Sequence, residues 1–276
     1  MASVRLGHSP DADDAFLFWG LATGKVTVPG LQFRHYVRDI ETLNRWAIRG
    51  WIEVTAMSAH AYAHVWDRYD LLRSGMSLGR GYGPLVVANE KRSLKSLAGQ
   101  TIAVPGRLTT AYLVLRLALA DFKPLFVRYD RVMESVRDGT AQAGVLIHEG
   151  QLTYGEHGLQ KVADLGAWWK RRTGLPLPLG VIGVKRGIAD STRKQIAQAI
   201  CSSIVLAHRN PQEALGYAMR FASGMDDRQV ERFVKMYSGP DAVDCGREGR
   251  LAVQELMKAA YQANLLRCPA KVSFVR

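Results

Sequence analysis

The chain has only three cysteines, Cys201, Cys245 and Cys268, and no two of them form a C-x-x-C pair. Cysteines that are far apart and odd in number provide neither a disulfide framework nor the ligand spacing of a zinc cluster. The sequence therefore predicts no structural metal site. It is typical of a protein from a reducing compartment.

Long apolar runs are also missing. Asp11, Asp13 and Asp14 interrupt the N-terminal stretch before the apolar core of a secretory signal can form. No later run approaches the roughly 20 apolar residues that span a bilayer. We therefore expect a cytoplasmic protein that does not associate with membranes. Its 276 residues, 47% of them hydrophobic, suffice for one large domain or two smaller lobes.

Several motifs of nucleotide-binding and hydrolytic enzymes are absent. The glycine-rich segment 78–84 precedes an apolar strand, whereas a dinucleotide fingerprint follows a strand and opens a helix. The chain contains neither a P-loop nor a G-x-S-x-G elbow. The segment starting at His148 begins like the zinc motif H-E-x-x-H, but its fifth residue is Leu152. These absences argue against nucleotide-dependent enzymes, serine hydrolases and zinc proteases.

Acidic residues are outnumbered by basic ones, 25 to 37, and the formal net charge is +12. Basic surfaces attract nucleic acid, but these lysines and arginines are scattered and form no basic arm or recognition motif. A positive field equally favours a small anionic substrate. We expect such a substrate and no nucleic-acid partner.

The hydrophobic pattern indicates an α/β protein. Short apolar segments alternate with amphipathic helices up to about residue 165, and the pattern from 191 onward is helical. The composition changes near Asn89, and the proline-rich segment 173–180 is incompatible with a helix. We interpret these two places as crossings between lobes. The first lobe would contain residues 1–88 and 181–276, including the C-terminal helices, and the second residues 89–180, with a cleft between them.

His148 is the leading candidate for a catalytic residue. It follows a predicted buried strand, residues 144–147, and ligands of open α/β sheets bind outside the carboxyl ends of the strands. A histidine delivered there is suited to proton transfer near neutral pH. The alternative is a structural histidine whose ring is bound by a backbone carbonyl.

Two other predicted strand ends, at residues 9–14 and 56–58, would face the same cleft. The aspartates of the first segment open a predicted helix, and we expect at least one of them to cap it rather than bind a metal. Thr109 and Thr110 open another helix. Free amides at such a start form an anion site, although a threonine there is equally explained as an N-cap.

Five segments carry a resemblance to a known family: 41–47 (ETLNRWA), 78–87 (LGRGYGPLVV), 104–112 (VPGR and TTAY), 147–149 (IHE) and 164–180, beginning DLGAWW. Their residues and order are similar to those of the 1,4-dihydroxy-6-naphthoate synthases of the futalosine route to menaquinone, which are related to periplasmic solute-binding proteins. The resemblance covers nearly the whole chain.

This resemblance implies a type II periplasmic-binding-protein fold and the conversion of cyclic dehypoxanthine futalosine to 1,4-dihydroxy-6-naphthoate, with no metal or organic cofactor. It also implies that His148 is the catalytic base. The substrate contacts that it implies are Ala56, Met57, Ser58, Thr110 and Ala111. We expect neutral His148 to act alone as the base, because Glu149 follows it on the strand and would point to the opposite face.

The chain departs from the family pattern at two places. Residues 9–14 read Ser-Pro-Asp-Ala-Asp-Asp where members read Ser-Pro-Cys-Pro-Asn-Asp, and Ala56 stands where some members have a lysine. An added carboxylate and a missing cation would weaken or redirect the binding of an anionic substrate. The remaining alternatives are a non-catalytic solute-binding protein of the same fold, a chorismate dehydratase-like enzyme of the same pathway and, on charge alone, a nucleic-acid-binding regulator.

Overall fold

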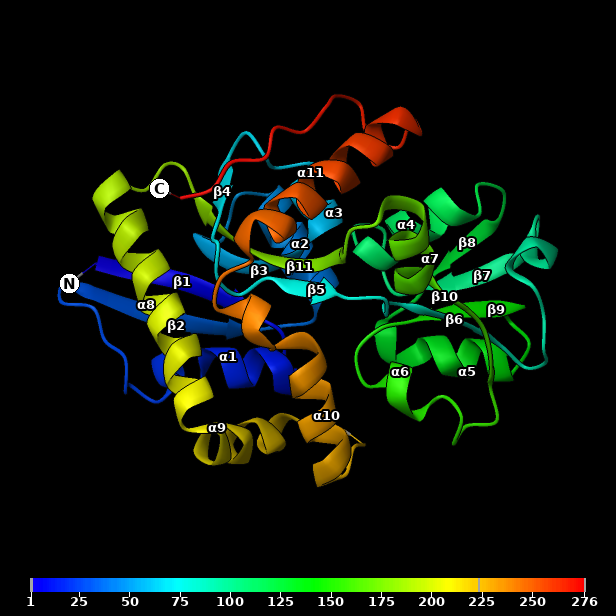
Figure 1. The fold of residues 1–276 in the computed structure, drawn as a ribbon, viewed down its shortest axis with the longest axis horizontal. Coiled ribbons are helices and arrows are strands. Elements are labelled where there is room, and N and C mark those ends of the chain that lie inside the picture. Colours follow the sequence, from blue (N-terminus) through cyan, green and yellow to red (C-terminus); the bar gives the residue numbers. More distant parts are fainter. Residues whose placement is uncertain (1, 223, 276) are drawn as a thin grey trace.

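The computed structural model describes residues 2–222 and 224–275, which form two α/β lobes, each built around one β-sheet (Figure 1). The strands are β1 (Ala2–His8), β2 (Leu31–Val37), β3 (Val54–Ser58), β4 (Tyr69–Leu71), β5 (Ser77–Gly79), β6 (Leu85–Ala88), β7 (Thr101–Val104), β8 (Lys123–Phe126), β9 (Ala143–Leu146), β10 (Gln160–Asp164) and β11 (Leu177–Lys185). The α-helices are α1 (Ala12–Ala22), α2 (Ile40–Ile48), α3 (Ala59–Tyr62), α4 (Thr110–Ala118), α5 (Val132–Arg137), α6 (Gly150–Thr153), α7 (Leu165–Thr173), α8 (Asp190–Arg209), α9 (Pro211–Ala218), α10 (Asp227–Tyr237) and α11 (Gly246–Gln262).

The sheet of the first lobe has the strand order β2-β1-β3-β11-β4, and β5 also pairs with β11. Strands β1, β2 and β3 are parallel, whereas β11 runs antiparallel to β3. All five residues of β3 are buried, as expected for a strand with a neighbour on each side and helices over the sheet. Helix α1 is apolar over most of its surface because α8, α9 and α10 pack around it (Figure 1). This packing fixes the loop between β1 and α1 at the carboxyl edge of the sheet.

The sheet of the second lobe has the order β10-β6-β9-β7-β8. Strand β9 lies at its centre, parallel to β7 and antiparallel to β6, and all four of its residues are buried. Gly144 allows α5 to approach closely, since a Cβ at this position would lie 2.6 Å from a methyl group of Val132. The strand that precedes His148 is therefore held from both sides and by a helix.

Both expected lobe boundaries lie too late in the chain. The sequence pattern assigns Leu85–Ala88 to the first lobe, but this strand, β6, pairs with β9 and β10 in the second sheet, so the chain crosses before Leu85. The polar stretch after Asn89 is an exposed loop of the second lobe rather than a linker. The return crossing also ends earlier than residue 180, because Leu177 already pairs with Gly79 in the first sheet. Residues 1, 223 and 276 of the expected lobes lie outside the described residues.

The C-terminal part of the chain is helical, as predicted, and α8 to α11 all pack on the first lobe (Figure 1). None of the helices in the described part of the chain combines the length and the apolar character that crossing a membrane requires.

Candidate functional site

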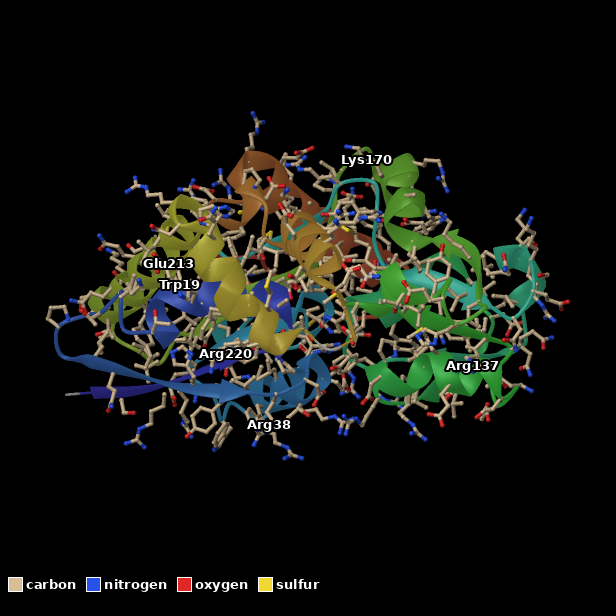
Figure 2. All side chains as sticks on the ribbon, turned by 90° about the horizontal axis from the view of Figure 1, so that it is seen from below. Trp19, Arg38, Arg137, Lys170, Glu213 and Arg220 are labelled. Carbon is tan, nitrogen blue, oxygen red and sulfur yellow. The ribbon has the colours of Figure 1, made fainter. Side chains whose placement is uncertain are left out.

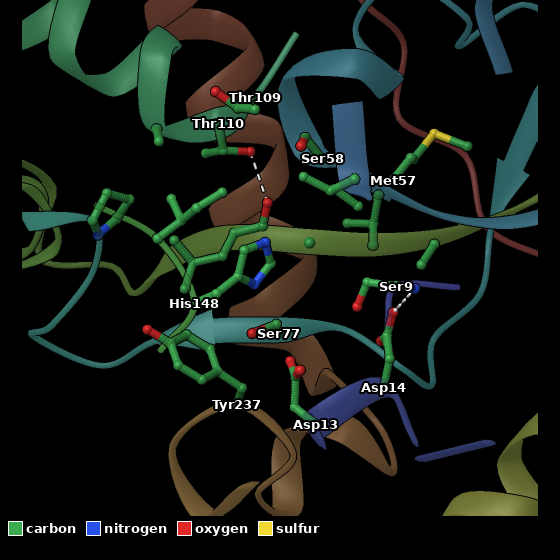
Figure 3. Close-up of a pocket in the computed structure, with 18 of the residues that line it drawn as sticks. Ser9, Asp13, Asp14, Met57, Ser58, Ser77, Thr109, Thr110, His148 and Tyr237 are labelled. Atoms are coloured by element: carbon green, nitrogen blue, oxygen red, sulfur yellow. Dashed lines mark hydrogen bonds between the residues drawn. The ribbon is translucent and has the colours of Figure 1, made fainter. Parts of the chain in front are cut away.

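A cavity lies where strand ends of both lobes meet (Figure 3). About 780 Å³ of space in it, part of it open to solvent, is not filled by protein atoms. All six residues expected in the site line it: His148, Ala56, Met57, Ser58, Thr110 and Ala111. The predicted strand ends and helix start therefore meet in one place.

His148 follows β9, and its backbone has a φ of +54°. A left-handed conformation is uncommon for a residue with a side chain and is concentrated at functional sites. The ring of Tyr129 packs edge-on against the imidazole, with 5.1 Å between the ring centroids. The side chain of His148 is 17% exposed and lines the cavity.

Asp11 is the partner of His148. Its Oδ2 atom lies 3.0 Å from Nδ1 of His148, and only 7% of the Asp11 side chain is exposed. Asp11 belongs to the β1–α1 loop of the first lobe, whereas His148 belongs to the second, so the contact joins the lobes. The expectation that an aspartate caps α1 is wrong. Asp11 occupies the N-cap position but makes no capping bond, because its carboxylate faces His148.

Burial alone would lower the pKa of His148, but the charge and hydrogen bond of Asp11, helped by Glu149 and Asp13, raise it to about 9. The pKa of Asp11 is lowered in turn, since the attraction of His148 outweighs the effect of burial. The pair is therefore imidazolium and carboxylate at neutral pH. Neutral His148, the form expected to act as the base, is therefore the minor form at pH 7.

The other two aspartates of the β1–α1 segment line the cavity itself. Burial, reinforced by the neighbouring carboxylates of Asp14 and Asp11, raises the pKa of Asp13 well above its usual value. Burial likewise raises the pKa of Asp14 to about 6, although its carboxylate accepts a 2.6 Å hydrogen bond from the N–H of Ser9. Asp13 therefore holds a proton more readily than an ordinary aspartate, and in its protonated form it can donate a proton or a hydrogen bond.

Three polar atoms of the cavity wall lack a hydrogen-bond partner among the described residues: Oδ1 of Asp13, Oγ of Ser77 and the hydroxyl oxygen of Tyr237. Buried polar groups are seldom left unpaired, and a bound ligand is one way to satisfy them. In Figure 3, these three side chains lie on the same side of the cavity. Sequence reasoning missed Ser77 and Tyr237 because neither belongs to a recognisable motif.

Of the two side-chain hydroxyl groups expected to contact the substrate, those of Thr110 and Ser58, only one is free to donate a hydrogen bond to it. Thr110 donates its hydroxyl to the carbonyl of Leu179 at 2.7 Å, so that hydroxyl cannot also donate to a ligand. Ser58 accepts a hydrogen bond at its Oγ and retains its own hydroxyl proton. Its partner there is Asn44, which sequence reasoning missed as a site residue although it lies in the ETLNRWA segment.

The start of α4 offers backbone amides. Thr109 is the N-cap, and its hydroxyl accepts a hydrogen bond from the N–H of Tyr112. The next two N–H groups, of Thr110 and Ala111, are among those that a helix cannot pair internally, and both residues line the cavity. Both interpretations of the Thr109-Thr110 pair are therefore compatible: Thr109 caps the helix, and the backbone amides that follow it are suited to binding an anion.

Within the described residues, neither lysine nor arginine lines the cavity. Figure 2 shows basic side chains over the outer surface, among them the exposed Arg38, Arg137, Lys170 and Arg220. The imidazolium of His148 and the amides of α4 are therefore the positive groups nearest to a ligand. The carboxylate of Asp11, which the family pattern lacks, is neutralised by His148 and does not line the cavity.

Comparison with solved structures defines the class of fold. The alkanesulfonate-binding protein SsuA from Xanthomonas axonopodis pv. citri is 16% identical, with a TM-score of 0.75 over 99% of this chain and 96% of its own. At this identity the likeness concerns the fold alone: two α/β lobes of the periplasmic-binding-protein type, as expected. The crystal structure of protein AF1704 from Archaeoglobus fulgidus is more similar, with 43% identity and a TM-score of 0.92 over 96% of this chain and 98% of its own.

The particular family follows from the sequence comparisons. The family described as menaquinone biosynthesis matches residues 4–262. The 1,4-dihydroxy-6-naphtoate synthase of Thermus thermophilus is 44% identical over 265 residues, which cover 96% of each chain. The chain belongs to this menaquinone biosynthesis family.

Proposed function

We propose that this chain converts cyclic dehypoxanthine futalosine to 1,4-dihydroxy-6-naphthoate, a lyase-type step of menaquinone biosynthesis, with His148 as the general base. The observation that carries the proposal is the position of His148, on the wall of a cavity shared by both lobes and bound to Asp11 through Nδ1. Its Nε2 atom is thereby left for the substrate. The name of the Thermus thermophilus relative supports the choice of product.

The substrate is a small anion, and the groups described above suit it. The amides of Thr110 and Ala111 at the start of α4 would hold its carboxylate, helped by the hydroxyl of Ser58. Apolar contacts with Ala56 and Met57 would cover the ring system, since both side chains are buried in the wall. A cavity closed by both lobes excludes water and fixes the reacting geometry.

In the reaction, neutral His148 would take a proton from the bound substrate at Nε2. The electron pair released would open the ring and aromatise the product while the sugar-derived fragment departs. Asp13 in its protonated form, which burial favours, would return a proton to that fragment and so balance the proton removed. Because the imidazole is charged below its pKa of about 9, the fraction of active base would rise with pH up to that value.

The test is product analysis by mass spectrometry with cyclic dehypoxanthine futalosine, comparing the parent protein with His148→Ala. Formation of the naphthoate by the parent, with a loss of at least about 100-fold in the variant, is expected for a lost general base. Equal activity of both would overturn the role of His148. Tight binding without turnover by either protein would favour a non-catalytic solute-binding protein, and turnover of chorismate alone would favour a dehydratase.

A further inference from the structure

We propose that Asp11 is the positioning residue of the base: it holds His148 in the tautomer that presents an unprotonated Nε2 to the substrate, across the boundary between the lobes. This inference rests on the proposed function, because it assigns a partner to the base proposed there. It also applies to a residue at which the chain departs from the family pattern, Asp11 in place of cysteine.

The geometry determines which ring nitrogen of His148 can act as the base. A neutral imidazole carries one proton, and the nitrogen that faces a carboxylate keeps it, because a carboxylate can only accept a hydrogen bond. The 3.0 Å contact with Asp11 therefore assigns that proton to Nδ1 of His148 and leaves the lone pair on Nε2. When Nε2 accepts a proton, the same carboxylate stabilises the imidazolium that forms, as in other histidine–aspartate pairs.

Glu149 cannot take this role. It directly follows His148 and sits at the N-cap position of α6, and the structure gives it no hydrogen bond to the imidazole among the described contacts. Asp11, in contrast, lies 137 positions earlier in the chain and reaches the ring from the other lobe. The pair therefore forms only where the two lobes meet, so the orientation of the base depends on how the lobes pack against each other at the cavity.

Other titratable groups face His148 as well. Asp13 and Asp14 approach from α1, Glu149 from its own segment and Tyr129 from the neighbouring loop. Burial opposes the charged imidazole, and Asp11 is the strongest of the groups that favour it. Removal of the Asp11 charge should therefore lower the pKa of His148 even though the remaining carboxylates stay in place.

The experiment compares the pH dependence of turnover in the parent, in Asp11→Asn and in Asp138→Asn. The last is a matched control, because Asp138 is exposed and lies outside the cavity. In the parent and the control, kcat/KM should rise tenfold per pH unit and level off near pH 9. In Asp11→Asn, the plateau should begin more than one pH unit lower and its height should fall at least about 100-fold, mainly through kcat.

A purely structural role for Asp11 would lower the amount of folded enzyme without moving the pH at which the plateau begins, and that result would overturn the proposal. An unchanged plateau height would overturn it as well. If His148→Ala is inactive while Asp11→Asn behaves like the control, the proposed base stands and only this inference fails.

A second measurement depends neither on turnover nor on the stability of Asp11→Asn. Nuclear magnetic resonance of the parent protein should show the His148 ring, assigned by its absence in His148→Gln, titrating near pH 9 with a far-downfield Nδ1 proton. A ring that titrates at its ordinary value near 6.5, without such a proton, would contradict the pairing with Asp11.

Discussion

Asn44 of α2 binds Ser58 of β3 at two points: its side-chain oxygen accepts the Ser58 N–H at 2.9 Å, and its amide nitrogen donates to the Ser58 hydroxyl at 3.0 Å. Asn44 is completely buried and Ser58 nearly so. The serine hydroxyl is therefore fixed as an acceptor toward Asn44, and its proton remains for the cavity. This contact connects a helix of the first lobe directly with the wall of the site.

Replacement of Asn44 should affect both stability and substrate affinity. In Asn44→Ala, a buried N–H is left unpaired, and we expect the free energy of unfolding to fall by about 1–3 kcal/mol. The released Ser58 hydroxyl should raise KM severalfold with a smaller change in kcat. The control is Asn89→Ala, which also loses an amide hydrogen bond, to the carbonyl of Val136 at 2.7 Å, but far from the cavity. Denaturant unfolding and steady-state kinetics would check both variants; an unchanged KM in Asn44→Ala would contradict the role assigned to Ser58.

Ser58 and Thr110 should respond differently to loss of the hydroxyl. Thr110→Val removes a hydrogen bond to Leu179 but keeps the backbone N–H that we assign to the substrate, so KM should stay within about twofold while about 1 kcal/mol of stability is lost. Ser58→Ala removes a donor to a charged group, and KM should rise about tenfold. Steady-state kinetics of the two variants would compare their KM values. A larger rise of KM in Thr110→Val than in Ser58→Ala would show that the hydroxyl of Thr110, not its backbone amide, contacts the substrate.

The crossing between the lobes depends on glycine. A Cβ on Gly166 would lie 1.9 Å from the carbonyl oxygen of Tyr82, a backbone atom that cannot turn away. Gly166→Ala should therefore cost about 1–3 kcal/mol of stability and reduce turnover by shifting the lobes. The control is Gly216→Ala in α9, where a Cβ meets nothing within 4 Å and stability should rise by about 0.5–1 kcal/mol. Thermal unfolding would compare them, and an equally stable Gly166→Ala would show that the contact can relax.

Much of the fold could be predicted from local patterns. The buried strand predicted at residues 144–147 forms at Ala143–Leu146, and Thr109 caps the helix that the sequence predicts to begin there. The assignment of β6 to a lobe failed because periodicity identifies a strand but not its neighbours. Leu85–Ala88 has the same apolar character as the strands of both sheets, and only pairing with β9 and β10 decides where it belongs.

The site shows the same limit. All residues that the strand ends and the resemblance predict for the site do line the cavity, because their positions follow from the topology of the sheets. The partner of His148 could not be found in this way, because Asp11 and His148 meet through the packing of two lobes. The protonation of the site was also beyond the sequence, because the pKa values of His148 and Asp13 depend on burial and on each other's charge.

The ion pair of Arg5 and Glu53 should make stability depend on pH outside the site. Glu53 accepts hydrogen bonds from the backbone N–H of Arg5 at 3.0 Å, from its Nε at 2.7 Å and from its terminal guanidinium nitrogen. Burial would raise the pKa of Glu53, but these bonds outweigh it and lower that pKa. A carboxyl group whose pKa is lowered by folding stabilises the protein above its unfolded value and loses that effect as the pH falls through the folded value.

Glu53→Gln should therefore reduce the free energy of unfolding by about 1 kcal/mol at pH 7. The difference from the parent should shrink as the pH falls below about 4.5, where the carboxyl group of the unfolded chain takes up its proton. Denaturant unfolding at several pH values between 3 and 7 would measure it. Glu90→Gln is the matched control, because Glu90 forms an exposed pair with Arg92 and its loss should change stability by less than about 0.5 kcal/mol. A Glu53→Gln difference that stays constant with pH would show that the cost comes from packing rather than from the charge.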